Sequence, residues 1–120
     1  MRQSTKFVTA IVRPFKIGEI LEALTRAGVQ ALTVTEVKGY GQNRGHTELY
    51  RGAEFIVEFE LMLKLEVAVP SDQVEKITEA IFQAARTGRS GDGKIFVSDS
   101  DYSVRIRTGK IDEMPPRRAA

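Results

Sequence analysis

The amino-acid sequence predicts an α+β domain whose elements follow the order β-α-β-β-α-β. Residues 58–69 alternate large apolar side chains with polar or smaller ones, which is the pattern of one long strand with a buried face and a wetter face. Apolar residues at helical spacing lie on either side of this strand, over residues 17–27 and 74–85. This order is that of the ferredoxin-like arrangement, an antiparallel sheet with two helices on one face.

Short runs rich in β-branched residues predict the other strands. The first covers residues 7–13 and ends at Pro14, and the second covers residues 31–38, after a helix that Gly28 ends. A later strand covers residues 94–98. Because the first strand carries apolar groups on both faces, we expect the open face of the sheet to be buried against other subunits.

The start of the second helix carries a capping pattern. Pro70 ends the long strand, and Ser71 or Asp72 is predicted to cap the helix, with Glu75 completing an Asp-x-x-Glu box. The predicted inner face of this helix consists of Val74, Ile77, Thr78, Ile81, Ala84 and Ala85.

Composition excludes several classes of function. The 120 residues suit one domain, and the absence of cysteine excludes disulfides, thiolate zinc sites and cysteine nucleophiles. A single histidine, His46, cannot build a multi-histidine metal site, so no metal site is predicted. The net charge is +2, from 18 basic and 16 acidic residues, and so small an excess of positive charge does not predict a nucleic-acid partner. With no apolar run near the roughly 20 residues of a membrane span and no signal peptide pattern, we expect a cytoplasmic protein without membrane insertion.

The sharpest functional motif is the glycine-rich turn TGRSGDGK at residues 87–94. It approaches a P-loop, but Ile95 stands where that motif needs Ser or Thr, and the turn leads from helix to strand rather than from strand to helix. Its three glycines allow backbone N–H groups to converge on one point, an anion-binding nest to which Lys94 adds a charge. A helix stop followed by a simple turn fits the spacing equally well.

Two arginines near the C-terminus favour the anion-binding interpretation. Tyr102, Val104 and Ile106 alternate as in a strand, which would direct Arg105 and Arg107 to the same side. Paired guanidinium groups are well suited to phosphate oxygens. The alternative is a solvated strand face that pairs with nearby carboxylates.

Residues 39–54 (GYGQNRGHTELYRGAE) predict a long loop, which in a compact domain is usually functional or mobile. Its glycines differ from a dinucleotide fingerprint by one extra residue, and no amphipathic helix follows, so that motif is excluded. Glu54, Glu58 and Glu60 are interpreted as a solvated polar edge. Nothing pairs a nucleophile with a base, so no catalytic residue and no enzyme is predicted.

Three stretches resemble signature segments of the PII signal-transduction proteins. KGYGQNRGHTELYRGAEF resembles the T-loop, TGRSGDGKIFV the B-loop and VRIRTG the C-terminal loop, in the right order over residues 7–109, and VRPFK and LTVTEVKG fit as well. The resemblance implies one domain over residues 1–120 that forms a homotrimer. Its T-loop would span about 39–57, its B-loop about 87–94 and its C-terminal loop and tail about 102–120.

The resemblance also implies that ATP or ADP binds in the clefts between subunits, and it leaves the role of Mg²⁺ open. Phosphates would be held by Gly91, Asp92, Gly93 and Lys94 of one subunit and by Arg105 and Arg107 of its neighbour. Thr33, Gly39, Gly41 and Glu66 would stand near the nucleotide, and Ile11 and Ala68 would line the base pocket. Nucleotide state would select the conformation of the T-loop, which would bind a transporter or an enzyme. The T-loop residues expected at that interaction are Asn43, His46, Tyr50 and Arg51.

Four positions depart from the family pattern. Phe55 replaces the tyrosine that is uridylylated in some members, and Ala53 replaces the serine that is phosphorylated in others, so both switches are expected to be absent. Asn43 replaces the glutamine of the 2-oxoglutarate site, although Gln42 beside it could substitute, and Met62 replaces the lysine that pairs with a carboxylate. Loss of such a charge-assisted contact costs about 2–3 kcal/mol, or about a hundredfold in affinity, so weak or absent 2-oxoglutarate sensing is predicted.

The sequence leaves four functions open. The leading interpretation is a regulator that reads adenine nucleotides and responds to another small anion, such as bicarbonate in inorganic carbon metabolism. The second is a nitrogen regulator of an ammonium transporter or a nitrogen-control enzyme, with Arg51 entering a transporter pore. An enzyme that uses ATP at the cleft and a purely structural trimer are the remaining two.

Overall fold

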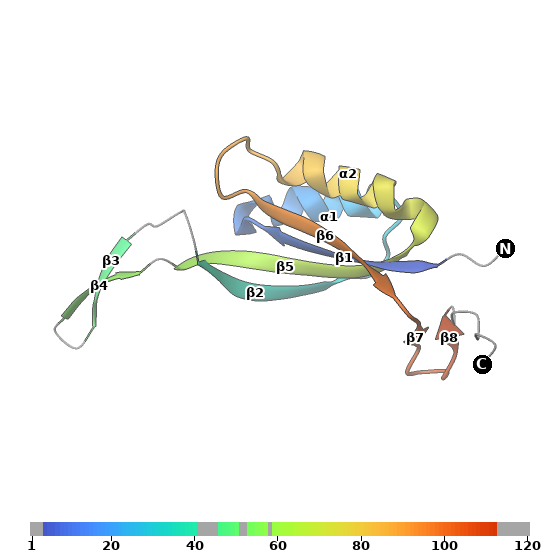
Figure 1. Ribbon diagram of the computed structural model, residues 1–120. Coiled ribbons are helices and arrows are strands. Elements are labelled where there is room, and N and C mark those ends of the chain that lie inside the picture. The colour runs from blue at the N-terminus through green and yellow to red at the C-terminus, as the bar shows by residue number, and fades with distance from the viewer. Residues whose placement is uncertain (1–3, 41–45, 51–52, 58, 113–120) are drawn as a thin grey trace.

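The computed structural model describes residues 4–40, 46–50, 53–57 and 59–112 and confirms the predicted ferredoxin-like α+β fold. A four-stranded antiparallel sheet has the order β2-β5-β1-β6 (Figure 1). Both helices lie on one face of this sheet. The elements are β1 (Thr5–Val12), α1 (Ile17–Arg26), β2 (Thr33–Tyr40), β5 (Phe59–Pro70), α2 (Val74–Ala85) and β6 (Gly93–Ser100).

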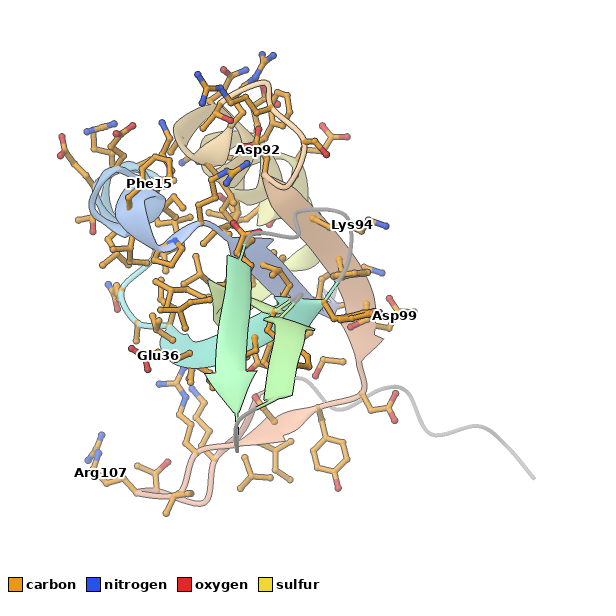
Figure 2. The ribbon with its side chains drawn as sticks, turned by 90° about the vertical axis from the view of Figure 1, so that its left-hand side faces the viewer. Phe15, Glu36, Asp92, Lys94, Asp99 and Arg107 are labelled. Carbon is orange, nitrogen blue, oxygen red and sulfur yellow. The ribbon has the colours of Figure 1, made fainter. Side chains whose placement is uncertain are left out.

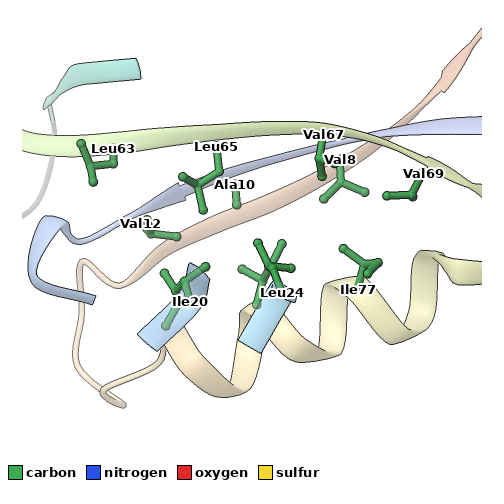
Figure 3. Packing of buried hydrophobic residues seen from close by; sticks show 12 residues of the cluster. Val8, Ala10, Val12, Ile20, Leu24, Leu63, Leu65, Val67, Val69 and Ile77 are labelled. Carbon is green, nitrogen blue, oxygen red and sulfur yellow. The ribbon is translucent and has the colours of Figure 1, made fainter. Parts of the chain in front are cut away.

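The core lies between the helices and one face of the sheet (Figure 3). Because side chains alternate along a strand, β5 directs every second residue toward the helices, and β1 does the same. Each valine, leucine or isoleucine side chain contributes about 1.5–3 kcal/mol when it is fully buried. The buried cluster consists of Val8, Ala10, Val12, Ile20, Leu24, Leu63, Leu65, Val67, Val69, Ile77, Ile81 and Ala85.

The predicted capping box of the second helix is wrong. A 3-10 turn over Ser71–Gln73 precedes α2, and Gln73 is the residue that stands before the helix, without a side-chain capping hydrogen bond. Ser71 donates its N–H to Ser4 O at 2.7 Å. Ser71 and Asp72 therefore lie inside the tighter 3-10 turn, two residues and one residue before Gln73.

A hairpin occupies part of the segment that the sequence predicted as a loop. Strands β3 (His46–Tyr50) and β4 (Ala53–Val57) pair antiparallel, with His46 opposite Val57 and Tyr50 opposite Ala53. Figure 1 shows this hairpin beyond the ends of β2 and β5. The prediction weighted the flanking glycines over the β-branched and aromatic residues between them, which favour strands.

The strand that was predicted to extend through Ile106 ends at Val104. Strand β7 (Ser103–Val104) pairs with β8 (Ile111–Asp112), and the chain turns between them. Arg105 N donates to Lys110 O at 2.8 Å and Gly109 N donates to Arg105 O at 2.7 Å. Gly109 has a φ of 72°, which glycine adopts readily, so the turn forms where alternation alone predicted an extended chain.

The second face of the sheet carries no helix among the described residues. Its side chains come from alternate positions of all four strands and include Ile11, Glu66, Ala68 and Lys94. The expectation that other subunits bury this face stays a prediction. Neither helix that the structure describes is both long and apolar enough to cross a membrane.

Candidate functional site

The 86–92 loop, which joins α2 to β6, is held by its own aspartate. The carboxylate of Asp92 accepts hydrogen bonds from the backbone N–H of Thr87 at 2.8 Å and of Gly88 at 2.9 Å, and from the Thr87 hydroxyl at 2.5 Å. The predicted nest is therefore filled in its first part by an anion of the protein itself. An external anion would meet the later part of the loop, where Gly93 and Lys94 begin β6.

Arg13 fixes the same loop from the end of β1. Its Nε donates to Asp92 Oδ1 at 3.0 Å, and its Nη2 donates to the Ser90 carbonyl oxygen at 2.6 Å. The side chain is only 15% exposed, so these contacts are partly shielded from water and salt. Sequence reasoning missed this role, although the segment VRPFK had been noticed, because nothing local to Arg13 indicates a partner 79 residues away.

Gly93 brings the end of the loop into contact with β1. Its φ is +108°, and a Cβ atom at this position would lie 1.8 Å from the Ile11 carbonyl oxygen. Gly88 also has a positive φ, +85°, but a Cβ atom there would meet nothing within 4 Å. Of these two glycines, Gly93 is required both by backbone conformation and by space, and Gly88 by backbone conformation alone.

The hydrogen bonds around Asp92 hold the pKa of its carboxyl group well below the ordinary value. The largest cause is the bond from the Thr87 hydroxyl, followed by the backbone N–H of Thr87, while Arg13 and the Gly88 N–H act in the same direction and partial burial opposes them. Because the folded-state pKa lies below the unfolded-state pKa, this carboxylate stabilises the fold above about pH 4. That stabilisation is lost as the pH falls further, toward the folded-state pKa.

We therefore expect Asp92→Asn to lower the melting temperature at neutral pH, and the gap to wild type to shrink below about pH 4, where the carboxylate of the unfolded wild-type chain becomes protonated. Thermal unfolding between pH 2 and pH 8 measures both effects. Asp101→Asn, at an exposed position outside the loop, is the matched control. A gap that stays constant down to pH 2 would contradict this account of Asp92.

The predicted nucleotide-binding residues form two separate groups in one chain. Ile11 lies opposite Lys94, whereas Thr33 lies opposite Glu66, further along the sheet. A hollow of about 300 Å³ is lined by Ile11, Asp92, Gly93 and Lys94, together with residues of α2. A second hollow of about 400 Å³ is lined by Ala68 and Arg105, together with residues 27–31.

The two hollows lie toward opposite ends of the sheet. Ile11 pairs with Lys64, four residues before Ala68 on β5, which corresponds to about 13 Å along the strand. In Figure 1 the 86–92 loop lies toward the hairpin end of the four-stranded sheet and the β7–β8 ribbon beyond its other end. Ile11 and Ala68, expected together at the base pocket, therefore line different hollows within a single chain.

The predicted pairing of Arg105 and Arg107 on one strand face is wrong. Both lie in the turn after β7, where successive residues no longer alternate between two faces. Arg105 lines the second hollow, and Arg107 projects away from the sheet (Figure 2). Ile106, expected on the opposite strand face, is 99% exposed.

Met62 is packed against Gly39 at the base of the hairpin. Only 5% of Met62 is exposed, and a Cβ atom on Gly39 would lie 3.4 Å from Met62 Cγ. Gly41, Asn43 and Arg51 lie outside the described residues. The positions of the predicted T-loop contacts His46 and Tyr50 and of the altered sites Ala53 and Phe55 are known only as backbone of β3 and β4.

Glu60 is not merely part of a solvated polar edge. Its Oε1 lies 3.5 Å from Arg13 Nη1, and its side chain is 34% exposed. Glu58 lies outside the described residues, and the side chain of Glu54 is likewise not described. Within the described ranges, no three His, Cys, Asp or Glu side chains are grouped to hold a metal ion.

Comparison with known proteins identifies the family. The family model described as Nitrogen regulatory protein P-II matches residues 5–110. The chain belongs to the nitrogen regulatory P-II family. This confirms the resemblance seen in the three signature stretches, and members of this family are signal-transduction regulators rather than enzymes.

Individual P-II proteins match over nearly their whole length. Nitrogen regulatory protein P-II of Rhizobium etli is 58% identical over 107 residues, which are 89% of this chain and 96% of the relative. Nitrogen regulatory protein GlnK of Escherichia coli K12 is 51% identical over 108 residues, 90% and 96% of the two chains. The crystal structure of Arabidopsis thaliana PII bound to citrate matches with a TM-score of 0.75 and 36% identity, covering 92% of this chain and 91% of that one.

These names favour one of the functions that the sequence left open. The P-II relatives are named for nitrogen regulation, so the chain is a P-II nitrogen regulatory signal-transduction protein. The leading interpretation, a response to bicarbonate, has no support in these names and stays a prediction.

Proposed function

We propose that this P-II protein binds ATP or ADP between copies of the chain and regulates a transporter or an enzyme through its T-loop. The observation that carries this proposal is the division of the predicted site. The 86–92 loop and Lys94 stand at one hollow, and Ala68 and Arg105 stand at another. Each hollow has only part of what a nucleotide needs, so a second copy of the chain would complete each one, as in a homotrimer.

Charge and shape support an adenine nucleotide at the completed cleft. Because Lys94 is exposed, its charge is accessible to a phosphate. Its Nζ lies 5.9 Å from the centre of the Phe96 ring. Ile11 lies opposite Lys94 and offers an apolar side chain on the same face of the sheet, and Arg105 would bring a guanidinium from the neighbouring copy. A flat apolar base with a charged tail fits such a mixed surface.

Met62 supports the loss of 2-oxoglutarate sensing. In the family pattern a lysine stands here and pairs with a carboxylate, and in this chain a buried thioether packs over Gly39 instead. The carboxylate of Glu60 lies two residues away on the same face of β5, where it pairs with Arg13. A dianionic acid would thus lose the attraction of the lysine.

Calorimetric titration tests this function. We expect ATP and ADP to bind to the wild type, and Lys94→Ala to weaken binding at least about tenfold, because a charge-assisted contact to phosphate is lost. Lys76→Ala, at an exposed lysine of α2 that lines neither hollow, is the matched control. Absence of nucleotide binding, or equal affinities for the two variants, would contradict the proposal.

The same titration distinguishes the second effector. With Mg²⁺ present, 2-oxoglutarate is expected to leave ATP affinity unchanged. If it tightens ATP binding instead, the interpretation of Asn43 and Met62 is wrong. If bicarbonate alone changes the affinity, the regulator responds to inorganic carbon.

A further inference from the structure

Arg13 connects two parts of the chain that are far apart in sequence. On one side it contacts the 86–92 loop, through Asp92 at 3.0 Å and the Ser90 carbonyl oxygen at 2.6 Å. On the other side it approaches Glu60 Oε1 at 3.5 Å. Three of its nitrogen atoms thus have three different partners. The planar fork of a guanidinium spreads its donors over three nitrogens, whereas the three donors of a lysine ammonium share one nitrogen.

Glu60 stands at the base of the hairpin. It is the second residue of β5, and it lies opposite Gly39 near the end of β2. In the chain β2 precedes β3 and β5 follows β4, and Figure 1 shows the hairpin beyond the ends of β2 and β5. A force on the Glu60 side chain therefore acts on the strands that carry the hairpin.

The side chains in the contacts of Arg13 are less exposed to solvent than those of a surface ion pair of the same chain. The exposed fractions are 15% for the Arg13 side chain, 23% for Asp92 and 34% for Glu60, whereas the Arg26–Glu22 pair on α1 has 67% and 72%. Exposed pairs of the second kind contribute little to stability. The guanidinium of Arg13 interacts with two carboxylates, so a change at either carboxylate alters the interaction of Arg13 with the other.

We propose that Arg13 is a positioning residue that fixes the 86–92 loop for ligand binding, and that Glu60 couples this loop to the base of the β3–β4 hairpin through Arg13. The identity of the ligand rests on the proposed function, whereas the coupling between loop and hairpin rests on these contacts alone. An anion bound beside Lys94 would also attract the Arg13 guanidinium. This attraction would change the contact between Arg13 and Glu60 and so affect β2 and β5.

Backbone hydrogen exchange of the free protein tests the mechanical part without any nucleotide. Arg13→Gln is expected to raise the exchange of the Thr87 and Gly88 amides about tenfold or more, because Asp92 loses one of the partners that orient it. Arg13→Lys should restore only part of this protection, and Arg26→Gln should change nothing in the loop. Unchanged exchange of the Thr87 and Gly88 amides in Arg13→Gln, with a wild-type melting temperature, would overturn the positioning role.

The coupling is tested by repeating the exchange with saturating ATP. In the wild type, ATP is expected to change exchange in β3 and β4 as well as in the 86–92 loop. In Glu60→Gln the change in the loop should persist while the change in the hairpin falls at least about threefold. Equal hairpin responses in wild type and Glu60→Gln would refute the coupling through Arg13.

Failure of ATP to bind at all would count against the proposed function and would leave the exchange results on the free protein intact. In that case a double-mutant cycle of Arg13→Gln and Glu60→Gln, read on hairpin exchange in the free protein, decides the coupling. Additive effects would overturn it, and a non-additive result would support it.

Discussion

Gly93→Ala is expected to lower the free energy of unfolding by about 3–5 kcal/mol, a large part of the 5–15 kcal/mol that a small domain typically has. Two effects add at this position. A φ of +108° is unfavourable for any residue with a Cβ atom, and that atom would lie 1.8 Å from the Ile11 carbonyl oxygen. Ile11 belongs to β1, which lies between β5 and β6, so the backbone that would have to move is held on both sides.

Gly88→Ala separates the two effects. It introduces the same methyl group at a φ of +85°, but into open space, so we expect a cost of only about 1 kcal/mol. Urea unfolding of both variants measures the difference. Equal destabilisation of the two variants would mean that backbone conformation alone, and not the contact with β1, makes Gly93 necessary.

The fold could be predicted because its signals are local and repeated. The alternation along residues 58–69 predicted the strand that is β5, and the helical spacing over residues 17–27 predicted the helix that is α1. Helix α1 ends before Gly28, which has a φ of +98°. The failures occurred where hydrogen bonds between particular atoms override a pattern. The turn between β7 and β8 is closed by Arg105 and Lys110, and no periodicity of the sequence specifies that bond.

The candidate site was predictable in composition but not in arrangement. The glycine turn, Lys94 and Arg105 were identified from their residue types and spacing, and the family resemblance added Ala68 of the second hollow. The use of Asp92 as an internal ligand of its own loop was not foreseen, because an aspartate among glycines suggests a turn as readily as an anion substitute. Arg13 and Glu60 were missed because their partnership spans 47 residues.

Mixing two defective variants is expected to restore nucleotide binding that neither has alone. Lys94→Ala damages the hollow beside the 86–92 loop, and Arg105→Ala damages the hollow beside Ala68. Each homo-oligomer therefore has a lesion in every cleft. In mixed oligomers, a cleft formed by Lys94 of one copy and Arg105 of another is intact, and random cyclic assembly would give about a quarter of all clefts in this form.

The measurement is the number of high-affinity ATP sites per chain by calorimetry, after the two variants have been unfolded and refolded together. Native mass spectrometry establishes that copies have mixed, and samples refolded separately and then combined are the control. If both halves of the site came from the same chain, every site would retain a lesion and mixing would restore nothing. Recovery near one quarter thus requires a cleft between copies, because no rearrangement within one chain can join an intact Lys94 to an intact Arg105.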